Sequence, residues 1–243
     1  MKGQYADWSV RHSEPARIPG LFRAWILSVT VGECIGFCIP AFVGALVMGQ
    51  AVPVAFAALA LAGSLEGAVL GWSQARVLRQ PLRRLSSRRW IVNTSAAAAL
   101  AWSIGMLPST AHDLWSRWPI LLIVVAAAAL GLVLLCSIGT AQWLELRRHV
   151  PRTGRWVTAT AAAWCAGLVA FSAVTSPLWQ PGQRPALVAA IGALGGLVMA
   201  LTVAVGTGWA LIRLLRIAQA DQVGVAITAD PRSKSDQPWK NAW

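Results

Sequence analysis

Gly71-Trp-Ser-Gln-Ala-Arg-Val-Leu-Arg79 closes an apolar stretch of this chain, and two similar segments close later ones. The later copies are Gly139-Thr-Ala-Gln-Trp-Leu-Glu-Leu-Arg147 and Gly208-Trp-Ala-Leu-Ile-Arg-Leu-Leu-Arg216. Two further landmarks keep nearly the same spacing, a tryptophan that opens one apolar run and a proline that opens the next. They are Trp25, Trp90 and Trp156, and Pro53, Pro119 and Pro185. Such a period indicates one supersecondary unit used three times.

The composition indicates a membrane protein. Of the 243 residues, 56% are hydrophobic and only 12% are charged, whereas a soluble domain has about 25% charged residues. Nearly uncharged stretches of about 20 residues, the length that crosses a bilayer, recur along the chain and argue against a soluble protein with a large core. The predicted spans are 23–48, 52–76, 90–107, 118–143, 156–176 and 185–213.

The net charge of +12 raises the question of a nucleic-acid partner. However, the cations lie in the gaps between the apolar runs, which is typical of cytoplasmic loops beside a membrane. With both termini inside, 19 of the 21 cations are cytoplasmic, and only Arg117 and Arg184 are outside. We therefore predict a multi-pass protein of the cell membrane with cytoplasmic N and C termini and no nucleic-acid partner.

The repeats predict an all-α integral membrane fold of six transmembrane helices. Each repeat has two spans, so the three repeats are parallel and related by an axis along the membrane normal. A ring of three hairpins is the simplest arrangement, and an irregular six-helix bundle is the alternative. The predicted parts are a cytoplasmic tail over 1–20, a transmembrane domain over 21–216 with repeats at about 23–79, 88–147 and 155–216, and a disordered cytoplasmic tail over 217–243.

Each landmark has a physical interpretation. The three tryptophans start the odd helices, and we expect them at the cytoplasmic interface, where an amphipathic ring is favoured. The prolines fit the first turn of the even helices, where the missing N–H costs nothing. Leu-Arg pairs are expected to end the even helices, with a cation beside the negative helix end and anionic headgroups. These pairs are Leu78-Arg79, Leu146-Arg147 and Leu215-Arg216.

Two acids, Glu33 and Glu66, fall within the spans at similar depth on consecutive helices. A charge at mid-membrane costs about 3 kcal/mol or more, so such residues usually face the bundle interior. One hypothesis is a proton or cation site in which one acid is protonated and hydrogen-bonded to the other. The alternative is a neutral hydrogen bond that ties the first hairpin together.

Small residues form stripes at four-residue spacing on the same helices. Such stripes let helices approach closely, and we expect the two stripes beside the acids to face each other. They are Gly63, Gly67 and Gly71 beside Glu66, and Gly32 and Gly36 beside Glu33. Gly192 and Gly196 repeat the spacing in the sixth span, and we interpret them as packing residues too.

Gln74 and Gln142 occupy matching places in the first two repeats, and Leu211 takes that place in the third. The glutamines either hydrogen-bond a neighbouring helix end, which we favour, or line a cytoplasmic vestibule or hold a lipid headgroup. The arginines that end the even helices, Arg79, Arg147 and Arg216, are candidate headgroup contacts of the same kind. The arginine-rich loops otherwise have the ordinary role of setting topology.

The sequence offers little support for catalysis. The three histidines are scattered, and no metal-ligand spacing, catalytic triad context or phosphate loop occurs. We therefore predict no catalytic residues, no metal, no cofactor and no enzymatic activity.

The repeated Gly-x-x-Gln-x-x-x-Leu-Arg ends, each followed by a basic loop and a Trp-led helix, resemble a group of small uncharacterised bacterial multi-pass membrane proteins. The resemblance covers roughly residues 60–216 and includes Arg89-Trp90 and Arg155-Trp156. It implies a membrane fold and no particular activity.

The function that the sequence favours is a non-catalytic one, in which the protein binds a lipid or a membrane-protein partner, with a homo-oligomer as one form of partner. The alternative is a small proton- or cation-coupled transporter or channel that uses Glu33 and Glu66. A membrane enzyme is the third class and the one with the least support.

Overall fold

The computed structural model describes the backbone of residues 18–229 and the side chains of residues 20–221. This part of the chain contains helices and no strand, which confirms the all-α prediction. Six helices are long and apolar enough to cross a membrane, as predicted. The helices are α1 (Ile18–Leu46), α2 (Val52–Leu78), α3 (Ser87–Thr110), α4 (His112–Trp115), α5 (Ile120–Leu146), α6 (Gly154–Leu178) and α7 (Pro185–Ala229).

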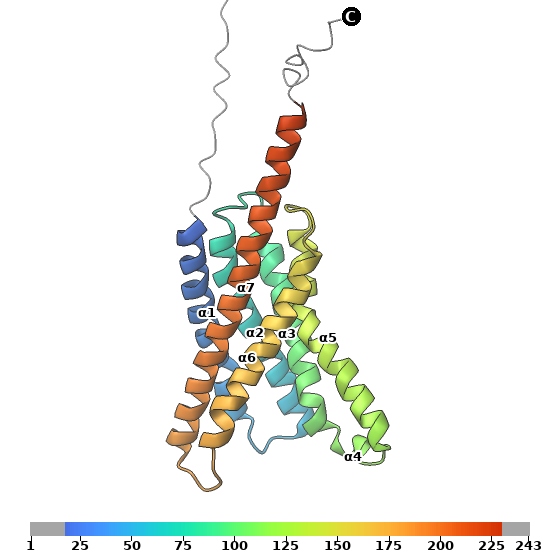
Figure 1. The fold of residues 1–243 in the computed structure, drawn as a ribbon. Helices are drawn as coiled ribbons and strands as arrows, with labels where there is room; N and C mark the ends of the chain where they lie inside the picture. Colours follow the sequence, from blue (N-terminus) through green and yellow to red (C-terminus); the bar gives the residue numbers. More distant parts are fainter. Residues whose placement is uncertain (1–17, 230–243) are drawn as a thin grey trace, which may run out of the picture.

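The six long helices form a closed ring (Figure 1). Each one packs against the next long helix in the chain, and α1 also packs against α7. Tight turns join α1 to α2 and α6 to α7, and each contains a glycine at φ 81°, Gly49 and Gly182, a conformation that other residues rarely adopt. The short helix α4 lies in the connection from α3 to α5. The grouping of the ring into three equivalent repeats stays a prediction.

The helix ends follow the predicted signals in most places. Pro53 is the second residue of α2, Pro119 caps α5, and Pro185 begins α7. Helices α2 and α5 end at Leu78 and Leu146, each just before its arginine.

The third helix end was predicted wrongly. Helix α7 passes Arg216 and continues to Ala229, so 217–229 is helical where we predicted a disordered tail. Residues 217–223 contain no proline or glycine and include Ala218 and Ala220, so nothing there stops an established helix from propagating. The rest of that predicted tail, 230–243, lies outside the described residues, as does most of the predicted tail over 1–20.

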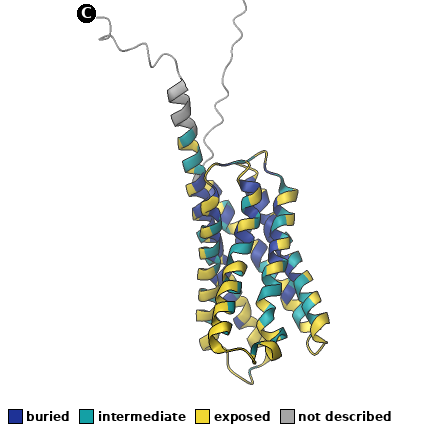
Figure 2. Ribbon diagram, turned by 90° about the vertical axis from the view of Figure 1, so that its right-hand side faces the viewer, coloured by how far each residue is buried: buried dark blue, intermediate teal, exposed yellow. Residues whose placement is uncertain are grey.

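The core occupies only one end of the ring, which we call the packed end; it is the end where α1 begins (Figure 2). No residue of 41–61, 99–137 or 168–190 is buried. These three stretches form the opposite end, which we call the open end, and there the helices spread apart (Figure 1). Under the predicted topology, the packed end is cytoplasmic.

Candidate functional site

Three tryptophans fill the centre of the packed end. Trp25, Trp90 and Trp156 are all 0% exposed. The ring centroid of Trp156 lies 6.1 Å from that of Trp25 and 6.3 Å from that of Trp90, distances typical of favourable aromatic pairs. The prediction that these residues sit at the membrane interface was therefore wrong, because their rings turn inward and pack on one another.

Each of these indole N–H groups donates a hydrogen bond to a polar side chain. Trp90 donates to Gln74 over 3.1 Å and Trp156 donates to Gln142 over 3.0 Å. Trp25 donates to Thr207 over 3.1 Å. Buried indoles usually need such a partner. In the predicted third repeat, where Leu211 stands in place of a glutamine, Thr207, four residues earlier, accepts the bond instead.

The two glutamines also bond to each other. The amide nitrogen of Gln142 donates to Gln74 Oε1 over 2.7 Å and to Thr94 Oγ1 over 3.2 Å. Gln74 is 3% exposed and Gln142 is 0% exposed. The structure thus places both glutamines in the core, on α2 and α5, rather than beside headgroups. Around Trp25 the matching places are apolar: Val29, four residues later on α1, replaces threonine, and Leu211 on α7 replaces glutamine, and both are buried.

The glycine stripe of α2 packs against α3. A side chain at Gly71 would meet Ile91 and Thr94, one at Gly67 would meet Ala98 and the Thr94 backbone, and one at Gly63 would meet Trp102. The expectation that this stripe faces α1 was wrong, since α3 takes that side of α2.

The glycine pairs of α1 and α7 differ from each other. Gly32 and Gly36 do pack on α2, at Ser73 and Glu66 respectively. Gly192 and Gly196 meet nothing within 4 Å, so their expected packing role is not found among the described residues.

The two intramembrane acids lie in the interior, as expected for such residues. Glu33 is 0% exposed and Glu66 is 5% exposed. Glu66 Oε2 accepts a hydrogen bond from the Trp102 indole over 2.7 Å. Both Glu33 oxygens lack a hydrogen-bond partner within the described part of the chain. Glu66 lies against Gly36, which is three residues from Glu33 on α1, but no described hydrogen bond joins the two carboxyl groups.

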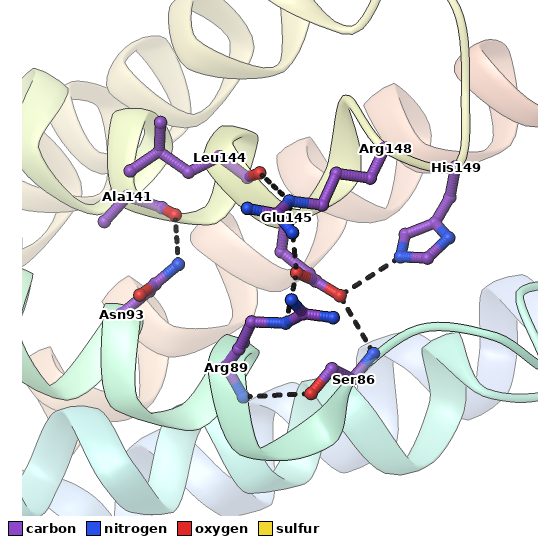
Figure 3. A network of polar contacts seen from close by, with 8 residues as sticks. All are labelled: Ser86, Arg89, Asn93, Ala141, Leu144, Glu145, Arg148 and His149. Carbon is purple, nitrogen blue, oxygen red and sulfur yellow. Dashed lines mark hydrogen bonds and ion pairs between the residues drawn. The ribbon is translucent and has the colours of Figure 1, made fainter.

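A third buried acid, Glu145, was missed in the sequence. It lies near the end of α5, is 1% exposed, and joins the loop before α3 to α5 (Figure 3). Its Oε1 accepts from the Ser86 backbone N–H over 2.9 Å and lies 3.1 Å from His149 Nε2. Its Oε2 lies 3.1 Å from Arg89 Nε and 3.9 Å from Arg148 Nε. The available signal was the spacing of Arg148 and His149, three and four residues after Glu145, within reach of its side chain at the end of α5.

We expect Glu145→Ala to lower the melting temperature of the purified protein. The change leaves the Ser86 N–H without its partner and removes the ion pairs. Because both arginines are half-exposed, we assign about 1–2 kcal/mol to the loss, or roughly 4 °C for a chain of this size. Thermal unfolding in detergent measures it. Asp113→Ala, at a fully exposed acid, is the control and should leave the melting temperature unchanged; equal shifts in both variants would contradict the structural role of Glu145.

Next to this network, the packed end has a surface pocket of about 440 Å³ between α2 and the start of α3. Its lining residues are Trp72, Ala75, Arg76, Arg79, Gln80 and Ser87. Neither arginine of the pocket pairs with an acid among the residues described. Arg79, a predicted headgroup contact, therefore lies in a pocket with two guanidinium groups that have no described acid partner.

The packed end also carries three tryptophan–arginine pairs on its surface, one on each of α2, α5 and α7. The arginine guanidinium lies over the indole ring at 4.6 Å for Trp72 and Arg76, 4.7 Å for Trp143 and Arg147, and 5.2 Å for Trp209 and Arg213. Trp72 and Trp209 are 52% and 60% exposed, so these residues, and not the three central tryptophans, have the interfacial character that the sequence suggested. Arg216, the third predicted contact, is exposed on α7.

Among the residues described, no three His, Cys, Asp or Glu side chains gather in a way that could hold a metal ion. In comparisons with protein families, with curated proteins and with solved structures, the chain matched none. The chain is a multi-pass membrane protein of six spanning helices.

Proposed function

We propose that this protein is a non-catalytic membrane protein that binds an anionic phospholipid of the cytoplasmic leaflet in the pocket between α2 and α3. The observation that carries the proposal is that one pocket holds two guanidinium groups without a described acid partner, Arg76 and Arg79, beside the half-exposed indole of Trp72 on which Arg76 stacks. Arginine binds phosphate oxygens through fixed, parallel N–H groups. Gln80 and Ser87 add further polar hydrogens at the same place.

The start of α3 strengthens phosphate binding. Ser87 is the first residue of this 24-residue helix and lines the pocket. The first N–H groups of a helix have no partner within the helix and attract anions, helped by the helix dipole. At this end Glu145 already accepts from the Ser86 N–H and Ser86 Oγ from the Arg89 N–H, so the N–H groups of Ser87 and Arg88 are the ones left for an anion.

The surface of α2 favours a lipid over a soluble phosphate compound. Leu61, Leu65, Trp72 and Arg76 lie along one face of the helix, by the helical repeat. The first three are 63%, 50% and 52% exposed. From Arg76 to Leu61 this face extends about 22 Å at 1.5 Å per residue, roughly the depth of one leaflet with its headgroup. A phospholipid bound by its phosphate at Arg76 would lay an acyl chain along these leucines.

The experiment tests whether lipid binding depends on the charge of the lipid headgroup and on the two arginines of the pocket. We expect purified, delipidated protein to bind fluorescent phosphatidylglycerol more tightly than phosphatidylcholine. The double variant Arg76→Gln, Arg79→Gln should weaken phosphatidylglycerol binding about tenfold, because two charge-assisted hydrogen bonds are lost. The double variant Arg117→Gln, Arg184→Gln removes the same charge at the open end and should leave affinity within about twofold.

Two outcomes would contradict the proposal. Equal losses in both double variants would mean that the protein attracts anionic lipid only through its overall charge. Binding of soluble glycerol phosphate as tightly as the lipid would mean that the pocket holds a phosphate compound of the cytoplasm and that the leucine face has no role.

A further inference from the structure

The Glu33 carboxyl group lacks any described partner that would stabilise its charge. It is 0% exposed, and neither oxygen has a hydrogen-bond partner within residues 20–221. An ionised carboxylate in such surroundings is very unfavourable unless it is paired. The group therefore needs either a proton or a cation that comes from outside the described chain.

The helices around Glu33 supply no such cation at this depth. On α1 itself, Cys34 and Cys38 are the other titratable groups nearby. Helix α2 contributes Glu66 and, near its C-terminal end, Arg76. Helix α7 has no ionisable residue before Arg213. Helix α3, which packs on the far side of α2, has none between Trp90 and Thr110. Glu66 is thus the nearest charged group on these helices, and its charge repels that of Glu33.

Other polar groups on the same turns of α1 also lack a partner. Pro40 has no N–H, so the carbonyl group of Gly36 lacks its usual helical donor. Gly36 lies against Glu66: a Cβ atom there would be 3.1 Å from Glu66 Cγ. The hydroxyl of Thr30, three residues before Glu33, is also buried without a partner. Unsatisfied polar groups therefore gather around Glu33 along one stretch of α1.

Access to Glu33 is shorter from the open end than from the packed end. Toward the open end, the buried residues of α1 are Gly36 and Pro40, about 10 Å of helix, and no residue of 41–61 is buried. Toward the packed end lie Val29 and Trp25, both 0% exposed, and the tryptophan–glutamine cluster. This cluster closes the ring on that side.

From these observations we infer that Glu33 and Glu66 form a proton-binding site that exchanges with the compartment at the open end and is closed toward the packed end. Binding adds one proton to a Glu33 carboxylate oxygen, and release returns it to the same side. The site is separate from the lipid pocket, which lies at the packed end, so either proposal can fail while the other stands.

The test is carbodiimide labelling in sealed membrane vesicles, with the pH set separately on each side and the labelled residue identified by mass spectrometry. A hydrophobic carbodiimide reacts with protonated carboxyl groups inside the membrane. We expect labelling at Glu33 to fall about tenfold when the pH on the open-end side rises from about 5 to about 8. The same change on the packed-end side should have no effect. Glu145, which is ion-paired, should stay unlabelled and serves as the internal control.

Two variants distinguish a site that exchanges protons from a structural acid that is closed to both compartments. Glu33→Gln should remove the labelled peptide, and Glu66→Gln should change the pH at which Glu33 is half labelled because it removes the neighbouring charge. If Glu33→Gln does not fold, the pH response of the unmodified protein still decides. No labelling at any pH in folded protein, labelling that follows the packed-end pH, or protection by sodium ions at constant pH would each overturn the inference.

Discussion

Trp156→Ala is expected to lower the free energy of unfolding by about 3–5 kcal/mol, the cost of truncating a large buried aromatic residue. Trp156 is 0% exposed and packs on both Trp25 and Trp90. Its removal leaves a cavity at the centre of the ring and takes away the donor that bonds to Gln142. The cluster that closes the packed end would lose its central member.

SDS titration in mixed micelles, followed by circular dichroism, measures this loss without depending on tryptophan fluorescence. Trp209→Ala is the matched control, because that indole is 60% exposed on the outer surface of α7. We expect the control to stay within about 0.5 kcal/mol of the unmodified protein. A loss in Trp156→Ala no larger than that of the control would mean that the cluster does not hold the packed end together.

The three central tryptophans show which features of the fold the sequence could predict and which it could not. Their spacing correctly predicted that Trp90 and Trp156 lie in the first turn of a helix, α3 and α6, whereas α1 begins at Ile18, seven residues before Trp25. Spacing along the chain does not say which way a ring turns. A tryptophan near a helix start satisfies its N–H equally well at headgroups or at a buried partner. Thr94 and Thr160, each four residues after a tryptophan, were the signal for an inward face, because side chains four apart share one side of a helix.

The acids illustrate a different limit. Glu33 and Glu66 stood out because each interrupts an apolar run, and the structure places both in the interior. Glu145 did not stand out, because it lies among the arginines that were interpreted as setting topology. Its role depends on Ser86 and Arg89, more than fifty residues earlier, and no local pattern reveals such a long-range contact. The pocket at Arg76 and Arg79 likewise depends on where α3 begins relative to α2.

The glycines of α1 and α2 were correctly predicted to pack against another helix, but the stripe of α2 faces α3 and not α1 as predicted. A helix in a ring has two neighbours, and a stripe of small residues indicates close approach without saying to which of them. On α2, the stripe lies against α3, while Glu66, on the adjoining face, meets α1 at Gly36. Glu66 therefore lies between the contact of α2 with α1 and its contact with α3. Trp102 of α3 donates a hydrogen bond to Glu66.

Gly67→Ala is expected to destabilise the protein by about 2–3 kcal/mol through this contact with α3. A Cβ atom at Gly67 would meet Ala98, would lie 2.8 Å from the Thr94 carbonyl oxygen and 3.0 Å from Ser95 Cα. Two of these neighbours are backbone atoms, so relief requires the helices to separate, and overpacking of this kind typically costs 1–3 kcal/mol. The same SDS titration measures the change.

Gly192→Ala makes the same substitution in a helix where a Cβ atom meets nothing within 4 Å. Alanine favours helix more than glycine does, by about 1 kcal/mol in water, so this variant should lose no stability. The comparison therefore isolates the close approach of α2 and α3 from helix propensity. Equal stability of the two variants would show that the α2–α3 contact is looser than the structure has it. A loss confined to Gly67→Ala would support the close approach of α2 and α3, across which Trp102 donates its hydrogen bond to Glu66.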